Sequence, residues 1–412
     1  MNNDFIDFLP GMKTGDSLIS ALTVLPNYSD GIRLQNKSIR LVALSDLYKI
    51  YLPSHMSMEI YSKLYLALIR SMQKKISKAA IRQRNENHKA ITHRDYNGIL
   101  GGSDSFTIIG TSGIGKSSAI NRSIELLCEN GIIETNKPYT KIIPCLVVQC
   151  PFDSSVKGLL LEILRQVDET INSDYYKKAS KGRTTTDMLI GNVSQVALNH
   201  IGLLIVDEIQ NVVNSKNGRN LVGMLTQLIN NSGISICMVG TPECTVFFEQ
   251  AMQLARRSVG LQYQSLEFNN DFYKFCCNLF SYQYTAHKTE ISDAIIRWLY
   301  EHSGGVVSVV VSLIHDAQEI AILNGSELLN FESLNEAYNK RMTMLHGYIS
   351  PNIKKKAQTS KIKTNIASLT GKQDIQISNE NMLFDIIMAA KKGNFDVVSK
   401  LREQVIVEEV QI

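Results

Sequence analysis

The sequence predicts an α/β fold in which a parallel sheet flanked by helices is followed by a small all-α domain. Three observations lead to this prediction. Between about residues 101 and 262, short apolar segments alternate with helical segments, which is typical of parallel strands joined by crossover helices. A glycine-rich segment of the form G-x-x-x-x-G-K-S follows the first apolar segment. From residue 268 to about 346 the pattern is helical throughout.

Length and composition indicate a globular protein of more than one domain. The chain has 412 residues, of which 44% are hydrophobic and 20% charged. The formal net charge of +4 is only mildly basic, so any surface for nucleic acid would have to be local. Seven scattered cysteines without C-x-x-C spacing predict free thiols and argue against a zinc site.

The chain has no segment that is typical of a membrane or secreted protein. Its first residues, Met1–Lys13, carry two aspartates and no long apolar stretch, so we do not expect a signal peptide. No run approaches the roughly 18 uninterrupted apolar residues of a membrane span. We therefore expect a soluble, cytoplasmic protein.

We expect four regions along the chain. They are a helical, partner-binding region (1–100), a sheet-containing core (101–267), an all-α lid (268–346) and a linker with a C-terminal docking segment (347–412). An amphipathic helix over Met56–Met72 precedes a basic run from Lys74 to Arg94. The last region begins with a Lys-rich linker and contains an apolar helical patch, Met382–Arg402. That patch could dock a partner or pack on the rest of the chain.

The strands of the core are predicted from apolar runs that are nearly continuous, as in strands covered on both faces. They are Phe106–Ile109, Cys145–Val148, Leu203–Val206 and Ile234–Val239, with Leu261–Leu266 as a further strand. In the lid, the clearest helical patterns cover Ile291–Glu301 and Val306–Leu323.

The glycine-rich segment is a P-loop, placed as the motif requires between an apolar strand and a helix that begins near Ser117. Glycines let the backbone wrap closely around phosphate oxygens, and the helix N-terminus adds partial positive charge. We expect Lys116 to contact the β- and γ-phosphates of ATP and the Ser117 hydroxyl to bind Mg²⁺. The residues predicted to bind the nucleotide are Gly110, Thr111, Ser112, Gly113, Ile114, Gly115, Lys116, Ser117 and Ser118.

Two carboxylates follow the apolar run Leu203–Val206, at the end of a strand where open parallel sheets bind ligands. Asp207 suits the coordination shell of Mg²⁺, and Glu208 can polarise the water that attacks the γ-phosphate. Acidic residues also follow strands simply as solvated loop residues. Combined with the P-loop, the pair predicts ATP hydrolysis.

Three further residues are candidates for the hydrolysis step. Thr241 follows the Ile234–Val239 strand, where its hydroxyl could sense the γ-phosphate, although Thr-Pro also commonly opens a turn. Arg256 and Arg257 lie near a predicted helix end. One of them could act on a neighbouring subunit's nucleotide as an arginine finger, whereas adjacent arginines are more often solvated or in salt bridges.

Four segments together resemble the TnsC/TniB family of AAA+ transposition regulators: GTSGIGKSS, GLLIVDEIQNV, MVGTPE and LARRSVG, in this order. The resemblance covers about residues 100 to 320 and implies an AAA+ P-loop ATPase fold with a helical lid. It also implies ATP-dependent binding of double-stranded DNA, homo-oligomers in rings or helical filaments, and a link between a target selector and a transposase. Hydrolysis would then drive disassembly. After Gly304-Gly305 the chain has Val306-Val307-Ser308, so the lid arginine of many AAA+ proteins has no counterpart here.

Contact with DNA would be mostly to phosphates, and therefore salt-sensitive and tolerant of sequence. The candidates are Lys157, Lys177, Lys178, Lys181 and Arg183, between the second predicted strand and the Asp207 strand. Lysine-rich turns are also common as plain solvated surface. The Lys74–Arg94 run is a second basic candidate.

Two other functions use the same nucleotide site. One is an AAA+ helicase loader or replication initiator, and the other is a signalling ATPase that controls protein assembly without DNA. A small-molecule kinase is disfavoured, because Glu208 beside Asp207 suits water as the phosphoryl acceptor.

Overall fold

The computed structural model describes residues 8–77, 79–80, 82, 105–136, 139–180, 184–212, 218–245 and 260–346. The chain divides into two compact units, Met1–Ala357 and Gln358–Ile412, and every described residue belongs to the first. The predicted C-terminal docking segment, residues 347–412, therefore lies outside the described residues.

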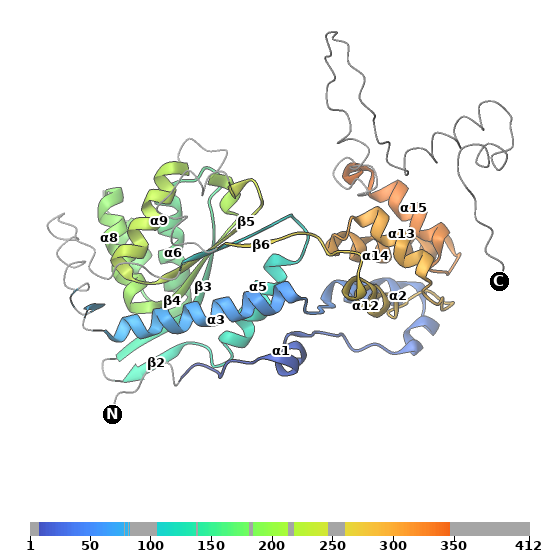
Figure 1. Ribbon diagram of the computed structural model, residues 1–412, viewed down its shortest axis with the longest axis horizontal. Helices are drawn as coiled ribbons and strands as arrows, with labels where there is room; N and C mark the ends of the chain where they lie inside the picture. Colours follow the sequence, from blue (N-terminus) through green and yellow to red (C-terminus); the bar gives the residue numbers. More distant parts are fainter. Residues whose placement is uncertain are drawn as a thin grey trace, which may run out of the picture. The chain divides into compact units, whose positions relative to one another are not determined.

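A six-stranded sheet forms the centre of the core, with the strand order β2-β3-β4-β5-β1-β6 (Figure 1). The strands are β1 (Phe106–Gly110), β2 (Ile133–Asn136), β3 (Tyr139–Gln149), β4 (Ile201–Asp207), β5 (Ser235–Gly240) and β6 (Leu261–Tyr263). All neighbours pair in parallel except β2, which is antiparallel to β3. The predicted parallel sheet is therefore confirmed. Strand β2 was not predicted because it is short and partly polar, and β6 ends at Tyr263, before the predicted end at Leu266.

Both faces of the sheet are covered, as the apolar strands predict. In β4, Leu203 and Ile205 pack on one face, while Leu204 and Val206 pack on the other. This alternation follows from the two-residue period of a strand. The helices α3 (His55–Ile76) and α5 (Lys116–Leu127) cover the first face, and α6 (Val156–Ile171), α8 (Thr186–His200) and α9 (Gly218–Ser232) cover the second.

The lid is all-α, as predicted. Its helices are α12 (Asn270–Phe280), α13 (Asp293–Ser303), α14 (Val307–Asn324) and α15 (Phe331–Arg341). Helix α14 is central and supplies buried side chains over most of its length. Among the described residues it is also the one helix with the length and hydropathy of a membrane span, but 56% of that window is buried in the lid. Such burial is typical of a core helix.

The described part of the N-terminal region is helical and packs against two hydrophobic cores. Leu44 and Leu47 lie in the hydrophobic core of the lid, beside α12 and α14. Helices α1 (Gly15–Leu22) and α3 instead contribute to the core beneath the sheet. The segment therefore packs on both the core and the lid, and its buried side chains are part of both hydrophobic cores.

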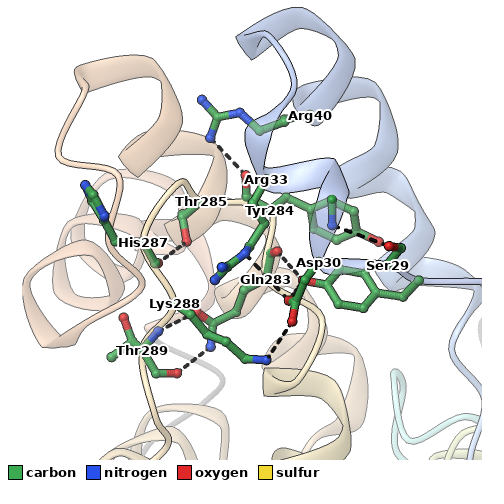
Figure 2. A network of polar contacts seen from close by, with 12 residues as sticks. Ser29, Asp30, Arg33, Arg40, Gln283, Tyr284, Thr285, His287, Lys288 and Thr289 are labelled. Carbon is green, nitrogen blue, oxygen red and sulfur yellow. Dashed lines mark hydrogen bonds and ion pairs between the residues drawn. The ribbon is translucent and has the colours of Figure 1, made fainter.

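Polar contacts fix the N-terminal residues to the lid segment between α12 and α13 (Figure 2). Arg40 is the most buried of the N-terminal residues in this network. Its guanidinium donates to both carboxylate oxygens of Glu327, at 2.6 and 2.8 Å, and to the carbonyl oxygen of Tyr284 at 2.9 Å. At the exposed edge of the network, Lys288 Nζ pairs with Asp30 Oδ2 at 3.3 Å.

Replacing Arg40 with alanine should destabilise the lid by about 3 kcal/mol, because removal of one partner leaves a largely buried carboxylate unpaired. The side chains of Arg40 and Glu327 are only 5% and 13% exposed. Trp298 in α13 is the single tryptophan of the chain, so its fluorescence during urea unfolding reports on the lid. Lys288→Ala is the matched control and should cost less than about 1 kcal/mol, because its ion pair is exposed. Equal unfolding midpoints for Arg40→Ala and Lys288→Ala would show that the buried pair stabilises the lid no more than the exposed pair does.

The same pair predicts a pH dependence. Hydrogen bonding to Arg40 holds the pKa of Glu327 below its ordinary value of 4.5. The folded state therefore prefers the ionised carboxylate of Glu327. The stability that the Arg40–Glu327 pair contributes is present at neutral pH and is lost as the pH falls through the folded-state pKa of Glu327. The stabilities of wild type and Arg40→Ala should converge in acid.

Candidate nucleotide site

The P-loop joins β1 to α5 through a backbone that only glycine tolerates at its key positions. Gly113 and Gly115 have φ angles of +81° and +98°, in the left-handed region. A Cβ on Gly110 would come within 2.6 Å of Ile114 Cδ1 and 2.8 Å of the carbonyl oxygen of Tyr263. The Ile114 side chain is buried and packs inside the protein. Only the backbone of Ile114 is therefore available to contact a ligand.

Lys116 is the first residue of α5, and its ammonium group lies over the start of the loop. Its Nζ donates to the carbonyl oxygens of Gly110 at 2.6 Å and Thr111 at 2.9 Å. Burial lowers the pKa of Lys116, while the charges of Asp207 and Glu208 oppose that shift. Further negative charge at this point, such as a phosphate, would favour the ammonium form in the same way.

The structure brings Ser117 and Asp207 together, although they are 90 residues apart in the chain. Ser117 Oγ donates to Asp207 Oδ2 at 3.4 Å, and Asp207 Oδ1 accepts from the backbone amide of Glu208 at 2.8 Å. A serine hydroxyl beside a carboxylate offers the hard oxygen ligands that Mg²⁺ prefers. These two residues therefore fit the predicted metal site at the carboxyl edge of the sheet.

Glu208 has a strained backbone, which the sequence analysis did not predict. Its φ angle is +57°, a left-handed conformation that costs a non-glycine residue about 1–3 kcal/mol. The side chain is exposed, and its carboxylate accepts a hydrogen bond from the amide of Gln210. Strain of this kind often occurs at functional sites, which is consistent with the role proposed for Glu208 below.

Thr241 follows β5, and β5 lies between the P-loop strand β1 and the acidic strand β4. Thr241 therefore lies at the same edge of the sheet as the P-loop and Asp207. In this structure it donates to the carboxylate of Glu243. Arg256 and Arg257 lie outside the described residues, so their predicted role as an arginine finger stays a prediction.

Of the basic residues predicted to contact DNA, Lys157 lies in a cleft at the carboxyl edge of the sheet. The cleft has a volume of about 520 Å³ and is lined by Ser155, Val156, Lys157, Thr186, Ile190, Asn220, Gly223, Met224 and Gln227. The helices α6 and α8 both begin here, with Ser155 and Thr185 as their N-caps. Helix N-termini and a lysine give this cleft positive character, which suits an anion such as a DNA phosphate.

The other predicted basic residues do not share this cleft. Lys177 and Lys178 are exposed on the short helix α7 (Tyr175–Ser180), beyond the other end of α6. A 16-residue helix is about 24 Å long, so they do not line the same cleft as Lys157. Lys181 and Arg183 lie outside the described residues.

One member of the Lys74–Arg94 run has a structural role instead. Lys75 is buried, and its Nζ donates to the carbonyl oxygens of Ala197 and Leu198 at 2.9 and 2.6 Å. It thereby neutralises the C-terminal end of α8 and is not available to DNA. The spacing of charges in the sequence cannot distinguish such a lysine from its exposed neighbours.

A turn over residues 151–155 connects the cleft to the acidic strand, and nothing in the sequence pattern predicted it. Ser154 Oγ donates to the carbonyl oxygen of Asn211, and the Asn211 amide donates to the carbonyl oxygen of Cys150, each at 2.9 Å. The amide of Cys150 donates to the carbonyl oxygen of Asp207 at 2.8 Å. At its tip this turn carries Phe152, which is 90% exposed. The turn at the edge of the cleft is therefore linked by hydrogen bonds to Asp207 and to Asn211, which follows β4.

One protein-family model matches the part of the chain that contains this site. The family model described as "Bacterial TniB protein" matches residues 102–265, which include the P-loop, Asp207, Glu208 and Thr241. No curated protein sequence matches the chain.

Three solved structures are similar at low sequence identity. ORC1 of Aeropyrum pernix in complex with DNA is 12% identical with a TM-score of 0.40, covering 82% of this chain and 80% of that chain. Drosophila ORC bound to DNA is 10% identical with a TM-score of 0.38, covering 97% of this chain and 83% of that chain. A Walker-type ATPase of Pyrococcus abyssi is 12% identical with a TM-score of 0.35, covering 80% and 90%.

Proposed function

We propose that this chain, an AAA+ ATPase whose residues 102–265 belong to the TniB family, is a DNA-bound switch that regulates transposition. Loaded with ATP, it oligomerises on duplex target DNA and links a target-site selector to the transposase. ATP hydrolysis then releases the assembly. The observation that carries this proposal is the family match over the same residues that form the nucleotide site.

The nucleotide site supplies the switch. Ser117 and Asp207 would hold Mg²⁺, which would supply positive charge to neutralise the transferring phosphoryl group. Lys116 binds the phosphates, and Glu208 orients and polarises the attacking water. Thr241, between β1 and β4, senses whether a γ-phosphate is present.

Subunit assembly completes the site. Arg256 or Arg257 from a neighbouring subunit is proposed to stabilise the charge on the transferring phosphoryl group. Hydrolysis would then depend on oligomerisation, and oligomerisation on DNA. This dependence is what makes the ATPase cycle a switch.

DNA is proposed to contact the cleft around Lys157. Lys157, Thr186 and Asn220 offer a cation, a hydroxyl and an amide, which are groups that commonly bind phosphate oxygens. Hydrogen bonds connect Ser154 to Asn211, Asn211 to Cys150, and Cys150 to the strand that ends at Asp207. Through these bonds, DNA bound in the cleft can influence the catalytic residues.

The test is ATP hydrolysis with and without duplex DNA, combined with sedimentation of protein and DNA in ATP or ADP. We expect DNA to stimulate hydrolysis and the ATP-loaded protein to co-sediment with DNA. Loss of both effects, with intact basal hydrolysis, would favour the signalling ATPase and refute the DNA-bound switch. Co-sedimentation without any effect of added transposase or selector on hydrolysis or DNA binding would favour the helicase loader or initiator.

Replacing Lys157 with alanine should weaken DNA binding at every sequence tested. It should also reduce the slope of log affinity against log salt concentration by about 1, because one phosphate contact is lost. Basal ATP hydrolysis should not change. Lys49→Ala is the matched control, since this lysine is exposed, pairs with Asp46 and is not among the predicted DNA contacts. An unchanged salt slope for Lys157→Ala would remove Lys157 from the DNA interface.

A further inference from the structure

The N-terminus of the central lid helix α14 lacks the local cap that the other lid helices possess. Asn269, Ser292 and Asn330 each accept a hydrogen bond from an amide in the first turn of α12, α13 and α15 respectively. The N-cap residue of α14 is Val306, whose side chain has no acceptor. The first amides of a helix have no partner within the helix, so they need one from elsewhere.

The P-loop provides that partner. The amide of Ser308, the second residue of α14, donates to the carbonyl oxygen of Gly113 at 3.0 Å. An N-cap side chain would normally accept from this same amide or from the next one. A residue of the nucleotide-binding loop therefore caps a helix of the lid.

Side-chain packing reinforces this hydrogen bond. A Cβ on Gly113 would overlap Ser308 Oγ and would lie 3.0 Å from Val306 Cγ1, so the start of α14 is seated directly on the loop. The preceding turn of the lid is fixed too, because the amide of Leu266 donates to the carbonyl oxygen of Gly305 at 3.0 Å. Leu266 lies in the short connection from β6 to the lid, so the turn before α14 is tied to this connection as well.

We propose that the P-loop caps α14. When the loop becomes ordered around the phosphates of ATP, the lid therefore becomes fixed against the loop in the same step. Val306 and Ser308 are positioning residues that act through Gly113 and do not touch the nucleotide. The contact gives the lid a response to bound ATP at the position where many AAA+ proteins carry an arginine. This inference depends on the nucleotide site alone and is independent of DNA.

Val306→Thr tests the proposal, because it keeps the branched shape and adds a hydroxyl at the N-cap. The backbone of Val306 is already extended, as an N-cap requires, so the new hydroxyl can accept from the Ser308 amide and compete with Gly113. Val307→Thr is the matched control, since it makes the same chemical change at the first helical residue, where the hydroxyl cannot serve as the N-cap. Neither Val306 nor Val307 is among the proposed catalytic residues.

We expect Val306→Thr to raise the KM for ATP about three- to tenfold, the equivalent of one hydrogen bond, with kcat changed less than about twofold. The melting temperature should stay the same or rise, because the lid helix gains a local cap. Amide hydrogen exchange over residues 307–311 should fall on ATP addition in wild type and in Val307→Thr. In Val306→Thr it should be slow with or without ATP.

Two results would overturn the proposal. The first is an unchanged KM for Val306→Thr together with ATP-dependent exchange as in wild type. The second is a Val307→Thr variant that raises KM as much as Val306→Thr does, since the effect would then not come from the cap. All measurements use the full chain without DNA, so they remain decisive whether or not DNA stimulates hydrolysis.

Discussion

Replacing Lys116 with alanine should abolish measurable ATP binding, a loss of at least about 100-fold in affinity. The Lys116 ammonium lies at the P-loop, where its donors contact the carbonyl oxygens of Gly110 and Thr111. In the nucleotide complex it would form charge-assisted hydrogen bonds to phosphate oxygens, and alanine can form none of them. Titration with a fluorescent ATP analogue measures the effect directly.

The control for this prediction is Lys177→Ala, which also removes one lysine charge but on the exposed helix α7. Its ATP affinity should equal that of wild type. Equal affinity for Lys116→Ala and wild type would mean that the P-loop is not the nucleotide site, and the proposed mechanism would fail with it.

Glu208→Gln should bind ATP with nearly wild-type affinity but hydrolyse it at least about 100-fold more slowly, since general base catalysis commonly contributes that much. The amide keeps the size of the carboxylate and can still bond to Gln210, but it cannot take a proton from water. If hydrolysis releases the assembly, this variant should remain bound to DNA long after wild type has dissociated. Steady-state phosphate release and DNA co-sedimentation over time measure the two effects.

Glu129→Gln provides the comparison, because it makes the same change at an exposed position just beyond the end of α5. It should hydrolyse ATP at the wild-type rate. If Glu208→Gln retained more than about a tenth of the wild-type rate, another group would have to serve as the base.

The sequence was sufficient to predict the sheet, the P-loop and the acidic strand end, because each leaves a local pattern. Continuous apolar runs such as Leu203–Val206 identify buried parallel strands, and the P-loop glycines are required by local backbone geometry. The contact between Ser117 and Asp207 then follows from the parallel topology, which brings the carboxyl ends of strands to one edge of the sheet.

Features that depend on distant partners could not be predicted in this way. The Arg40–Glu327 pair joins residues 287 positions apart and holds part of the N-terminal region against the lid. The burial of Lys75 depends on where α8 ends. The Gly113–Ser308 hydrogen bond depends on how the lid seats on the core. None of these leaves a periodicity or a motif.

The most direct test is an electron microscopy structure of the protein with duplex DNA, Mg²⁺ and a non-hydrolysable ATP analogue. The triphosphate should lie within the P-loop, the metal beside Ser117 and Asp207, and DNA phosphates at the cleft of Lys157. A nucleotide bound elsewhere, or a metal remote from Asp207, would show that the P-loop and the acidic strand end do not form the nucleotide site.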